Sequence, residues 1–160
     1  MANRKPLVIV DGQLRQMAAG DILDVQLNEV DFISATNNEA TAIVIGTPVY
    51  VNGNDTVKMA LADALATSEV IGLVTDETVA ANASARVLTD GRLTATTDQW
   101  DAVTGDVGGL TAGALYFLDP TTAGNLTTSA PTAEGEIVLK IGKALSTTVL
   151  EVTIGQTILL

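Results

Sequence analysis

The sequence contains no cysteine and no histidine. Without cysteine there is no disulfide, no thiolate nucleophile and no thiolate-bound zinc, and without histidine there is no imidazole to act as a general base or metal ligand. Any catalysis would depend on carboxylates, lysines or hydroxyl groups. These two absences therefore remove many common classes of enzyme from consideration.

Aromatic residues are also scarce, at 3% of the chain, although 47% of the residues are hydrophobic. The bulk of a core must come from valine, isoleucine, leucine and alanine, which suits packed β-layers. One Trp, two Tyr and two Phe are too few for a large platform on which bases or sugars stack. A chain of 160 residues with this composition can form one well-filled domain.

Basic residues are few and unevenly distributed. The chain has 8 Lys and Arg against 19 Asp and Glu, a net charge of −11. Residues 1–20 carry +2, with three basic residues and one acidic residue, whereas the other 140 residues carry −13, with five basic and eighteen acidic residues. Because an acidic body repels nucleic acid, we expect no nucleic-acid partner. One interpretation is that the three cations of residues 1–20 attract the protein to an acidic partner surface. The alternative is that these cations have no role in binding.

Long apolar runs are missing. The run Leu7–Val10 ends at Asp11, so it is shorter than the roughly 7–15 residues of a secretory signal. No run approaches the roughly 20 apolar residues of a membrane span. We therefore expect no membrane partner and a protein made in the cytoplasm without a cleaved signal.

The strongest candidates for paired catalytic carboxylates are Asp98 and Asp101, which flank Trp100. Two carboxylates three residues apart on a short helix more often lie on the solvent-exposed face of that helix. Trp100 is better explained as a core residue that plugs one end of a barrel than as a surface on which a ligand stacks. Residues 52–55 (NGND) could offer oxygens to calcium, but turn chemistry explains them better. The prediction is a non-enzymatic protein with no catalytic, cofactor-binding or metal-binding residues.

The leader contains a candidate partner interface. Pro6 favours an extended backbone at its neighbour, and the β-branched run after it predicts a strand that reaches the hairpin dipeptide Asp11-Gly12, with residues 13–17 returning antiparallel. A hairpin of this size needs support from another surface. Its backbone could add a strand to a partner sheet while its cations attract that partner. The residues assigned to this interface are Arg4, Lys5, Leu7, Val8, Ile9 and Val10.

Two parts of the chain resemble each other. Residues 46–51 (GTPVYV) and 113–118 (GALYFL) each begin with glycine and continue into an apolar run with one tyrosine. A strand with a central glycine follows each, at residues 70–74 (VIGLV) and 139–144 (LKIGKA). Such similarity marks a supersecondary unit used twice. Two copies predict two halves of one barrel or sandwich, with chance similarity between two β-hairpins as the alternative.

Turn and cap residues predict the connections. Asp90-Gly91 predicts a hairpin between strands at residues 85–89 and 92–96, and Pro48 is expected at an edge. Residues 57–66 favour strand and loop, with a short helix as the alternative. A further strand is expected within residues 22–32.

One short helix is expected around Trp100. Thr96 and Gln99 have the spacing of a capping box, and Gly105 stands where a C′ glycine ends a helix. The whole pattern predicts an all-β fold: a compact β-barrel or sandwich with an internal pseudo-repeat, this helix and an extended N-terminal arm. The arm spans residues 1–20 and the β-rich domain residues 21–160, with similar halves at about 42–96 and 109–156.

The opening residues 5–21 (KPLVIVDGQLRQMAAGD) resemble the start of many virion proteins of tailed bacteriophages, in which an apolar strand, a turn and a Gly-Asp step begin a fibre or decoration subunit. Residues 88–154 are similar to modules of such proteins. The segments that carry this likeness are residues 89–94 (TDGRLT), 99–105 (QWDAVTG), 109–113 (GLTAG), 116–118 (YFL) and 121–127 (TTAGNLT), together with 70–76. The likeness covers well over half of the chain and concerns structural pattern.

The resemblance implies a β-rich subunit that forms a homotrimer on the virion. The chain lacks a coiled coil, a collagen-like run and a repeated shaft, which favours capsid decoration over a long fibre. The expected function is that of a capsid decoration (cement) protein, made in the host cytoplasm, which binds the major capsid protein on the outer surface of the phage head. The alternative is a short tail-fibre, collar or adhesin module involved in host attachment.

Overall fold

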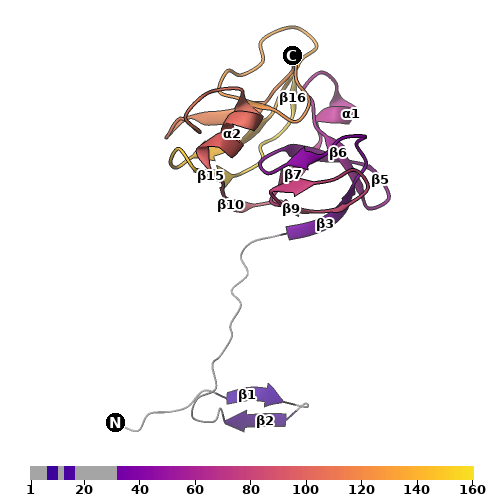
Figure 1. The fold of residues 1–160 in the computed structure, drawn as a ribbon, viewed down its shortest axis with the longest axis vertical. Helices are drawn as coiled ribbons and strands as arrows, with labels where there is room; N and C mark the ends of the chain where they lie inside the picture. The colour runs from indigo at the N-terminus through magenta and orange to yellow at the C-terminus, as the bar shows by residue number, and fades with distance from the viewer. Residues whose placement is uncertain (1–6, 11–12, 17–31) are drawn as a thin grey trace.

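The computed structural model describes residues 7–10, 13–16 and 32–160 of the chain (Figure 1). Near the N-terminus, β1 (Leu7–Val10) and β2 (Gln13–Gln16) form a two-stranded antiparallel sheet. The predicted pairing of these strands is confirmed. Their turn at Asp11-Gly12 lies outside the described residues, as do residues 17–31, in which most of the strand expected at 22–32 would fall.

A closed five-stranded barrel forms the first part of the body. Aliphatic side chains from its strands fill it, among them Val49, Val57, Val74 and Val87. The neighbours β3 and β6 run parallel, and the other neighbouring pairs run antiparallel. The strands in order are β3 (Phe32–Asn37), β6 (Thr56–Met59), β5 (Pro48–Gly53), β7 (Val70–Val74) and β9 (Ser84–Leu88), and a short pair beside them is β4 (Ile43–Val44) with β8 (Thr78–Val79).

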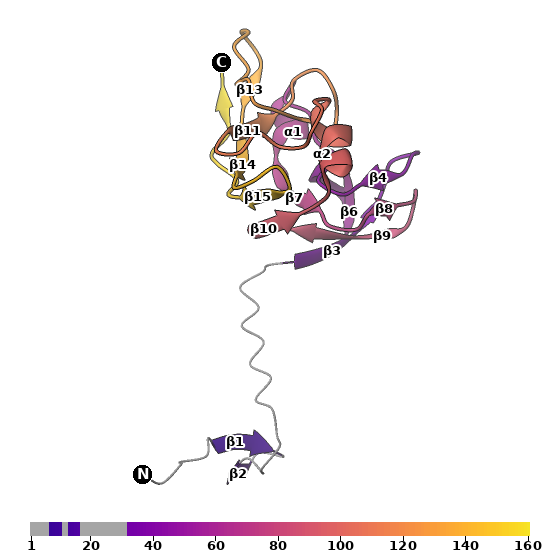
Figure 2. The ribbon, with the colours of Figure 1, turned by 60° about the vertical axis from the view of Figure 1, so that its left-hand side comes forward.

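A five-stranded antiparallel sheet forms the second part of the body (Figure 2). One face of this sheet buries Leu93, Tyr116, Ile141 and Leu150 in the larger hydrophobic core. Its strands in order are β10 (Gly91–Thr94), β15 (Val149–Val152), β14 (Lys140–Ala144), β11 (Leu115–Leu118) and β12 (Leu126–Thr127), and β13 (Ile137–Val138) pairs separately with β16 (Ile158–Leu159).

Two short helices complete the described fold. The first, α1 (Leu65–Ser68), was not predicted and overlaps residues 57–66 only at its first two positions. The strand and loop preferred for residues 57–66 are present as β6 and the residues that follow it. The second, α2 (Thr97–Thr104), is the helix predicted around Trp100. The Thr96 hydroxyl accepts from the Gln99 backbone N–H, the Gln99 side chain accepts from the Thr96 N–H, and Gly105 is left-handed with φ 72°. The capping box and the C′ glycine are therefore confirmed.

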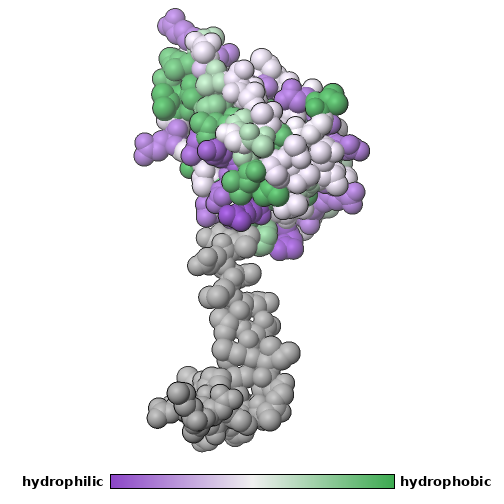
Figure 3. All heavy atoms as spheres, turned by 90° about the vertical axis from the view of Figure 1, so that its left-hand side faces the viewer, coloured by the Kyte–Doolittle hydropathy of each residue, from purple (hydrophilic) through white to green (hydrophobic). Residues whose placement is uncertain are grey.

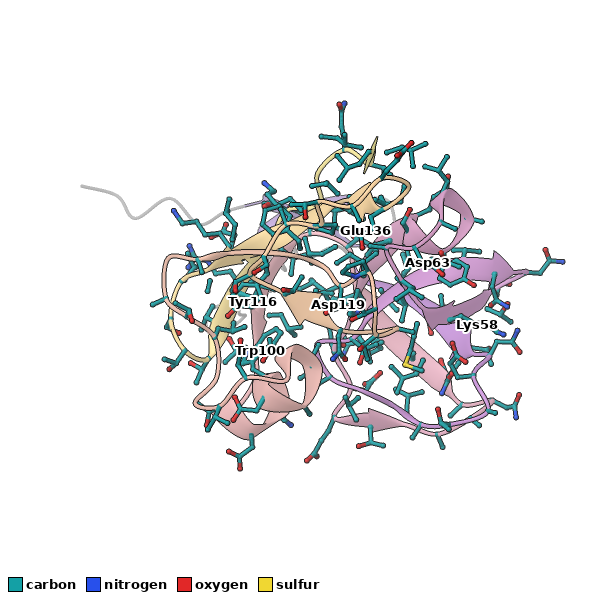
Figure 4. The ribbon with its side chains drawn as sticks, turned by 90° about the horizontal axis from the view of Figure 1, so that it is seen from above. Lys58, Asp63, Trp100, Tyr116, Asp119 and Glu136 are labelled. Carbon is teal, nitrogen blue, oxygen red and sulfur yellow. The ribbon has the colours of Figure 1, made fainter. Side chains whose placement is uncertain are left out.

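Trp100 is a core residue that joins the two parts of the body. Its side chain is fully buried, and its Nε1 donates to the carbonyl of Thr148, 3.0 Å away, in the turn between β14 and β15. Its ring also lies against Gly46, in the chain between β4 and β5. The expected core position is confirmed, while its role as a plug at one end of the barrel stays a prediction. The indole has no exposed surface on which a ligand could stack (Figure 4).

The two similar segments have the same pairing pattern. In the first, Pro48, Val49 and Tyr50 of β5 pair with Leu73, Gly72 and Val70 of β7, and the register shifts after Val49. In the second, Leu115, Tyr116 and Phe117 of β11 pair with Lys143, Gly142 and Lys140 of β14, and the register shifts after Tyr116.

The hydrogen bonds and glycines of these two units also correspond. The N–H of Gly46 donates to the carbonyl of Val74, and that of Gly113 donates to the carbonyl of Ala144, both at 2.8 Å. Both glycines have positive φ, 85° and 82°. The sequence similarity therefore coincides with a repeated strand arrangement, while the proposed bounds of the halves stay a prediction.

Two local predictions are wrong. Asp90-Gly91 does not close a hairpin, because β9 pairs with β3 and β7 whereas β10 pairs with β15. The dipeptide instead carries the chain from the barrel to the second sheet. Pro48 begins β5, which lies between β6 and β7 and is not an edge strand; as its first residue, Pro48 contributes a carbonyl that accepts from the Ala60 N–H.

The all-β fold class is confirmed. The structure contains a closed barrel, as expected, with a second sheet packed against it through a shared core. It differs from the expectation in having two short helices among its described residues where one was predicted. The division into an arm at residues 1–20 and a domain at residues 21–160 stays a prediction.

Candidate partner interface

The predicted interface falls on the first strand of the N-terminal ribbon, which is defined here as β1 with β2. Leu7, Val8, Ile9 and Val10 form β1, and they pair in register with Gln16, Arg15, Leu14 and Gln13 of β2. Arg4 and Lys5 lie outside the described residues. The structure thus places four of the six predicted residues on one strand and leaves the position of the two cations undescribed.

The edges of the ribbon are suited to strand addition. Within the described part of the chain, β1 and β2 pair only with each other. Each strand therefore has a second edge, whose backbone N–H and C=O groups have no strand partner among those residues. Such an edge is a template for pairing with another chain.

A second candidate surface lies on the body, on the side of the second sheet opposite its buried face. We call this surface the basic face and define it by Arg92, Leu115, Phe117, Lys140 and Lys143. Cross-strand pairing brings these residues together, because Leu115 lies opposite Lys143, and Phe117 opposite Lys140. Arg92 joins them through Glu151, which pairs with both Arg92 and Lys143.

The basic face is open to solvent at its centre. Leu115 is 44% exposed, and Lys143 and Arg92 are also exposed, whereas Phe117 and Lys140 are partly buried. Apolar and hydrophilic side chains lie next to one another on the side of the body that Figure 3 shows. A surface with an apolar centre and charged surroundings is typical of a protein-binding site.

The charge of this face differs from that of the rest of the body. Residues 32–160 contain five basic and fourteen acidic residues, and three of the five basic residues lie on the basic face. Arg92 Nε is 3.6 Å from Glu151 Oε2, an exposed ion pair worth about 0–1 kcal/mol. Lys140 and Lys143 have no ion-pair partner among the described residues. Two cations are therefore available to an acidic partner.

The carboxylates examined for catalysis serve the local fold. The Asp101 side chain accepts from the N–H groups of Gly108 and Gly109, at 3.0 and 2.6 Å, and so holds the loop after α2. Asp98 lies exposed in the first turn of α2. Residues 52 and 53 end β5 and residues 54 and 55 form the turn to β6, with Asp55 at φ 52°.

The carboxyl group of Asp119, just after β11, has a lowered pKa. Partial burial acts to raise this pKa, but hydrogen bonds from the Thr121 hydroxyl and from the N–H groups of Thr121 and Thr122 outweigh burial and hold the pKa below its usual value. All three donors follow Asp119 directly in the chain, so the carboxylate closes a turn after β11.

The described residues contain no detected pocket and no group of three or more acidic side chains placed to hold a metal ion. Among the same residues, no helix is long and apolar enough to cross a membrane. The side chain of Asn37, which is fully buried, donates to three carbonyls and accepts from the Glu39 N–H, so it organises loops near β3.

A scan of the sequence against models of protein families found no match, and a search of curated proteins found no match either.

Sequence reasoning missed the basic face. Its five residues come from β10, β11 and β14, and no short motif connects them. The internal similarity offered a signal, because each unit contains a glycine-headed apolar run followed by a strand with a central glycine. The pairing of residues 113–118 with residues 139–144, which the sequence analysis did not predict, brings Leu115 and Phe117 next to the two lysines.

Proposed function

We propose that this chain is a non-enzymatic structural protein of a bacteriophage virion, and specifically a capsid decoration protein that binds the outer surface of the head. In this proposal the N-terminal ribbon anchors the protein to the major capsid protein, and the body covers and reinforces the shell. The protein would be made in the host cytoplasm and assembled onto the head as a homotrimer.

The observation that carries the proposal is the free-edged ribbon that precedes a body with a closed barrel and an aliphatic core. The barrel strands pair around a full circle, so the barrel itself offers no unpaired strand. The ribbon, in contrast, has unpaired edges among the described residues, and Arg15 lies opposite Val8 in its register. Strand addition to a partner sheet would supply backbone hydrogen bonds, and the net charge of +2 on residues 1–20 would favour an acidic partner.

The sequence resemblance supports the choice of a capsid as that partner. The opening segment that resembles virion proteins is the segment that forms the ribbon. A body with an aliphatic core and a fully buried tryptophan is suited to a passive, load-bearing role.

Binding to heads that lack the protein tests this proposal. Full-length chain should bind such heads at saturating occupancy, and a variant without residues 1–20 should bind at least about tenfold more weakly, because it loses the strand and its cations. Circular dichroism must first show that the shortened chain keeps its β-structure. Unchanged occupancy of the shortened chain would contradict the anchor.

A full-length variant separates charge from strand pairing. Arg4→Glu with Lys5→Glu should weaken head binding most at low salt, since screening reduces the contribution of exposed charges. The matched control replaces two cations of the body, Lys58→Glu with Arg86→Glu, and should bind as wild type does. An equal loss of head binding in both variants would mean that the net charge of the chain, and not the cations of residues 1–20, controls binding. Saturable binding to host cells, with none to heads, would support the adhesin alternative and contradict the proposal.

A further inference from the structure

A second exposed surface of the body complements the basic face in charge. We call it the acidic turn and define it by Asp63, Leu65 and Glu69, which lie in and beside α1. Leu65 is 52% exposed, and both carboxylates are exposed. The acidic turn therefore presents an apolar side chain between two negative charges.

The shape of the acidic turn is fixed by local hydrogen bonds. The Thr67 hydroxyl donates to Asp63 Oδ1 at 2.8 Å, the Ser68 N–H donates to the carbonyl of Ala64, and the Leu61 N–H donates to the carbonyl of Thr67. Neither Asp63 nor Glu69 has an ion-pair partner among the residues that the structure describes. A rigid turn loses little conformational entropy when it binds, which favours its use as a contact.

The two surfaces match in the arrangement of charge. On the basic face, Leu115 and Phe117 lie beside Lys143 and Lys140, two cations separated by about 10 Å along a strand. On the acidic turn, one carboxylate precedes α1 and one follows it, with exposed Leu65 between them. Opposite charges around apolar centres give electrostatic complementarity.

The two surfaces do not meet within one copy. The Ala62 N–H, next to the acidic turn, donates to the carbonyl of Asp119 just after β11, so the turn borders the end of the second sheet. Among the described residues, neither carboxylate of the turn forms an ion pair with Lys140 or Lys143. Contact between the two surfaces therefore requires two molecules.

We propose that the acidic turn of one copy docks on the basic face of a second copy. Leu65 would pack on Leu115 and Phe117, while Asp63 and Glu69 would pair with Lys140 and Lys143. Because the two patches differ, the contact is heterologous, so it closes into a ring if the rotation permits and otherwise extends as a filament. A ring of three copies would be the homotrimer that the sequence resemblance implies.

Two complementary variants of the full chain test the proposal. The face variant carries Lys140→Glu and Lys143→Glu, and the turn variant carries Asp63→Lys and Glu69→Lys. Sedimentation velocity of each variant alone should show self-association weakened at least about tenfold relative to wild type, because like charges then meet across the contact. The matched control, Lys58→Glu with Arg86→Glu, makes the same change in net charge as the face variant and should associate as wild type does.

Mixing the two variants gives the decisive result. The face variant keeps a native turn and the turn variant keeps a native face, and the reversed turn of one also complements the reversed face of the other. An equimolar mixture should therefore recover the association that each variant alone has lost. A chain with all four substitutions has reversed charges on both surfaces and should recover self-association. These measurements use only this chain, so they succeed or fail independently of binding to heads.

Three results would overturn the proposal: a wild-type chain that stays monomeric at high concentration, a face variant that associates as strongly as wild type, or a mixture that associates no more strongly than its two components alone. Circular dichroism and thermal unfolding of each variant establish that it is folded. Since all four substituted residues are at least partly exposed, their replacement should leave the fold intact.

Discussion

The indole of Trp100 lies directly against the backbone of Gly46: a Cβ atom at position 46 would stand 2.9 Å from Cζ3 of the ring. Gly46 belongs to the first of the two similar units, and the Thr148 carbonyl that accepts from the indole N–H belongs to the second. The side chain of Trp100 on α2 therefore contacts both the barrel and the second sheet and holds them together. The stability of the body should depend strongly on this contact.

Replacement of Gly46 by alanine tests the contact. Gly46→Ala should lower the free energy of unfolding through left-handed strain of about 1–2 kcal/mol and through overpacking of about 1–3 kcal/mol. Gly113 is the matched control, because it has nearly the same φ but open space around its missing Cβ. Gly113→Ala should cost only the strain. Equal losses for the two variants in urea unfolding would show that the ring does not press on position 46.

The central glycines of β7 and β14 should be intolerant of any side chain. A Cβ at Gly72 would overlap the carbonyl of Leu88 in β9, and one at Gly142 would overlap the carbonyl of Glu151 in β15. Each substitution to alanine forces two paired strands apart, and we expect a loss of about 3 kcal/mol or more in the free energy of unfolding. Gly155→Ala serves as the control, because Gly155 has no positive φ and a Cβ there would meet Lys140 Cβ at 3.4 Å, an ordinary contact distance. If Gly72→Ala or Gly142→Ala unfolds at the same urea concentration as wild type, the strands paired at that glycine lie farther apart than the structure shows.

The turn at Asp119 should stabilise the fold in a pH-dependent way. Hydrogen bonds outweigh burial and hold the pKa of this carboxyl below its usual value of 3.8 in the folded state. The stabilisation is therefore fully present above the unfolded pKa and is lost as the pH falls through the lower, folded value. NMR titration should place the Asp119 midpoint below 3.8, and Thr121→Val, which removes the hydroxyl donor, should raise it. A midpoint above 3.8 in the wild-type chain would contradict this balance of hydrogen bonding and burial.

Features set by local chemistry were predictable from the sequence. Thr96, Gln99 and Gly105 defined α2 correctly because a capping box and a left-handed C′ residue need only neighbours in the chain. The internal similarity anticipated corresponding pairs of strands, since a glycine at the strand crossing and an apolar run recur in both units.

Features set by distant strands were not predictable. The same dipeptide, Asp-Gly, lies between paired strands at Asp11-Gly12 but joins two separate sheets at Asp90-Gly91, because both edges of β9 are occupied by β3 and β7. The basic face was missed for a related reason. Lys143 meets Leu115 only through a cross-strand register that no local pattern contains.

The location of the chain on a virus particle tests the central claim most directly. Electron cryomicroscopy of virions that carry this protein, compared with particles assembled without it, should show added density on the outer surface of the head, into which the barrel and second sheet fit. Density confined to the tail, the collar or a fibre tip, or no difference between the two particles, would contradict assignment as a capsid decoration protein.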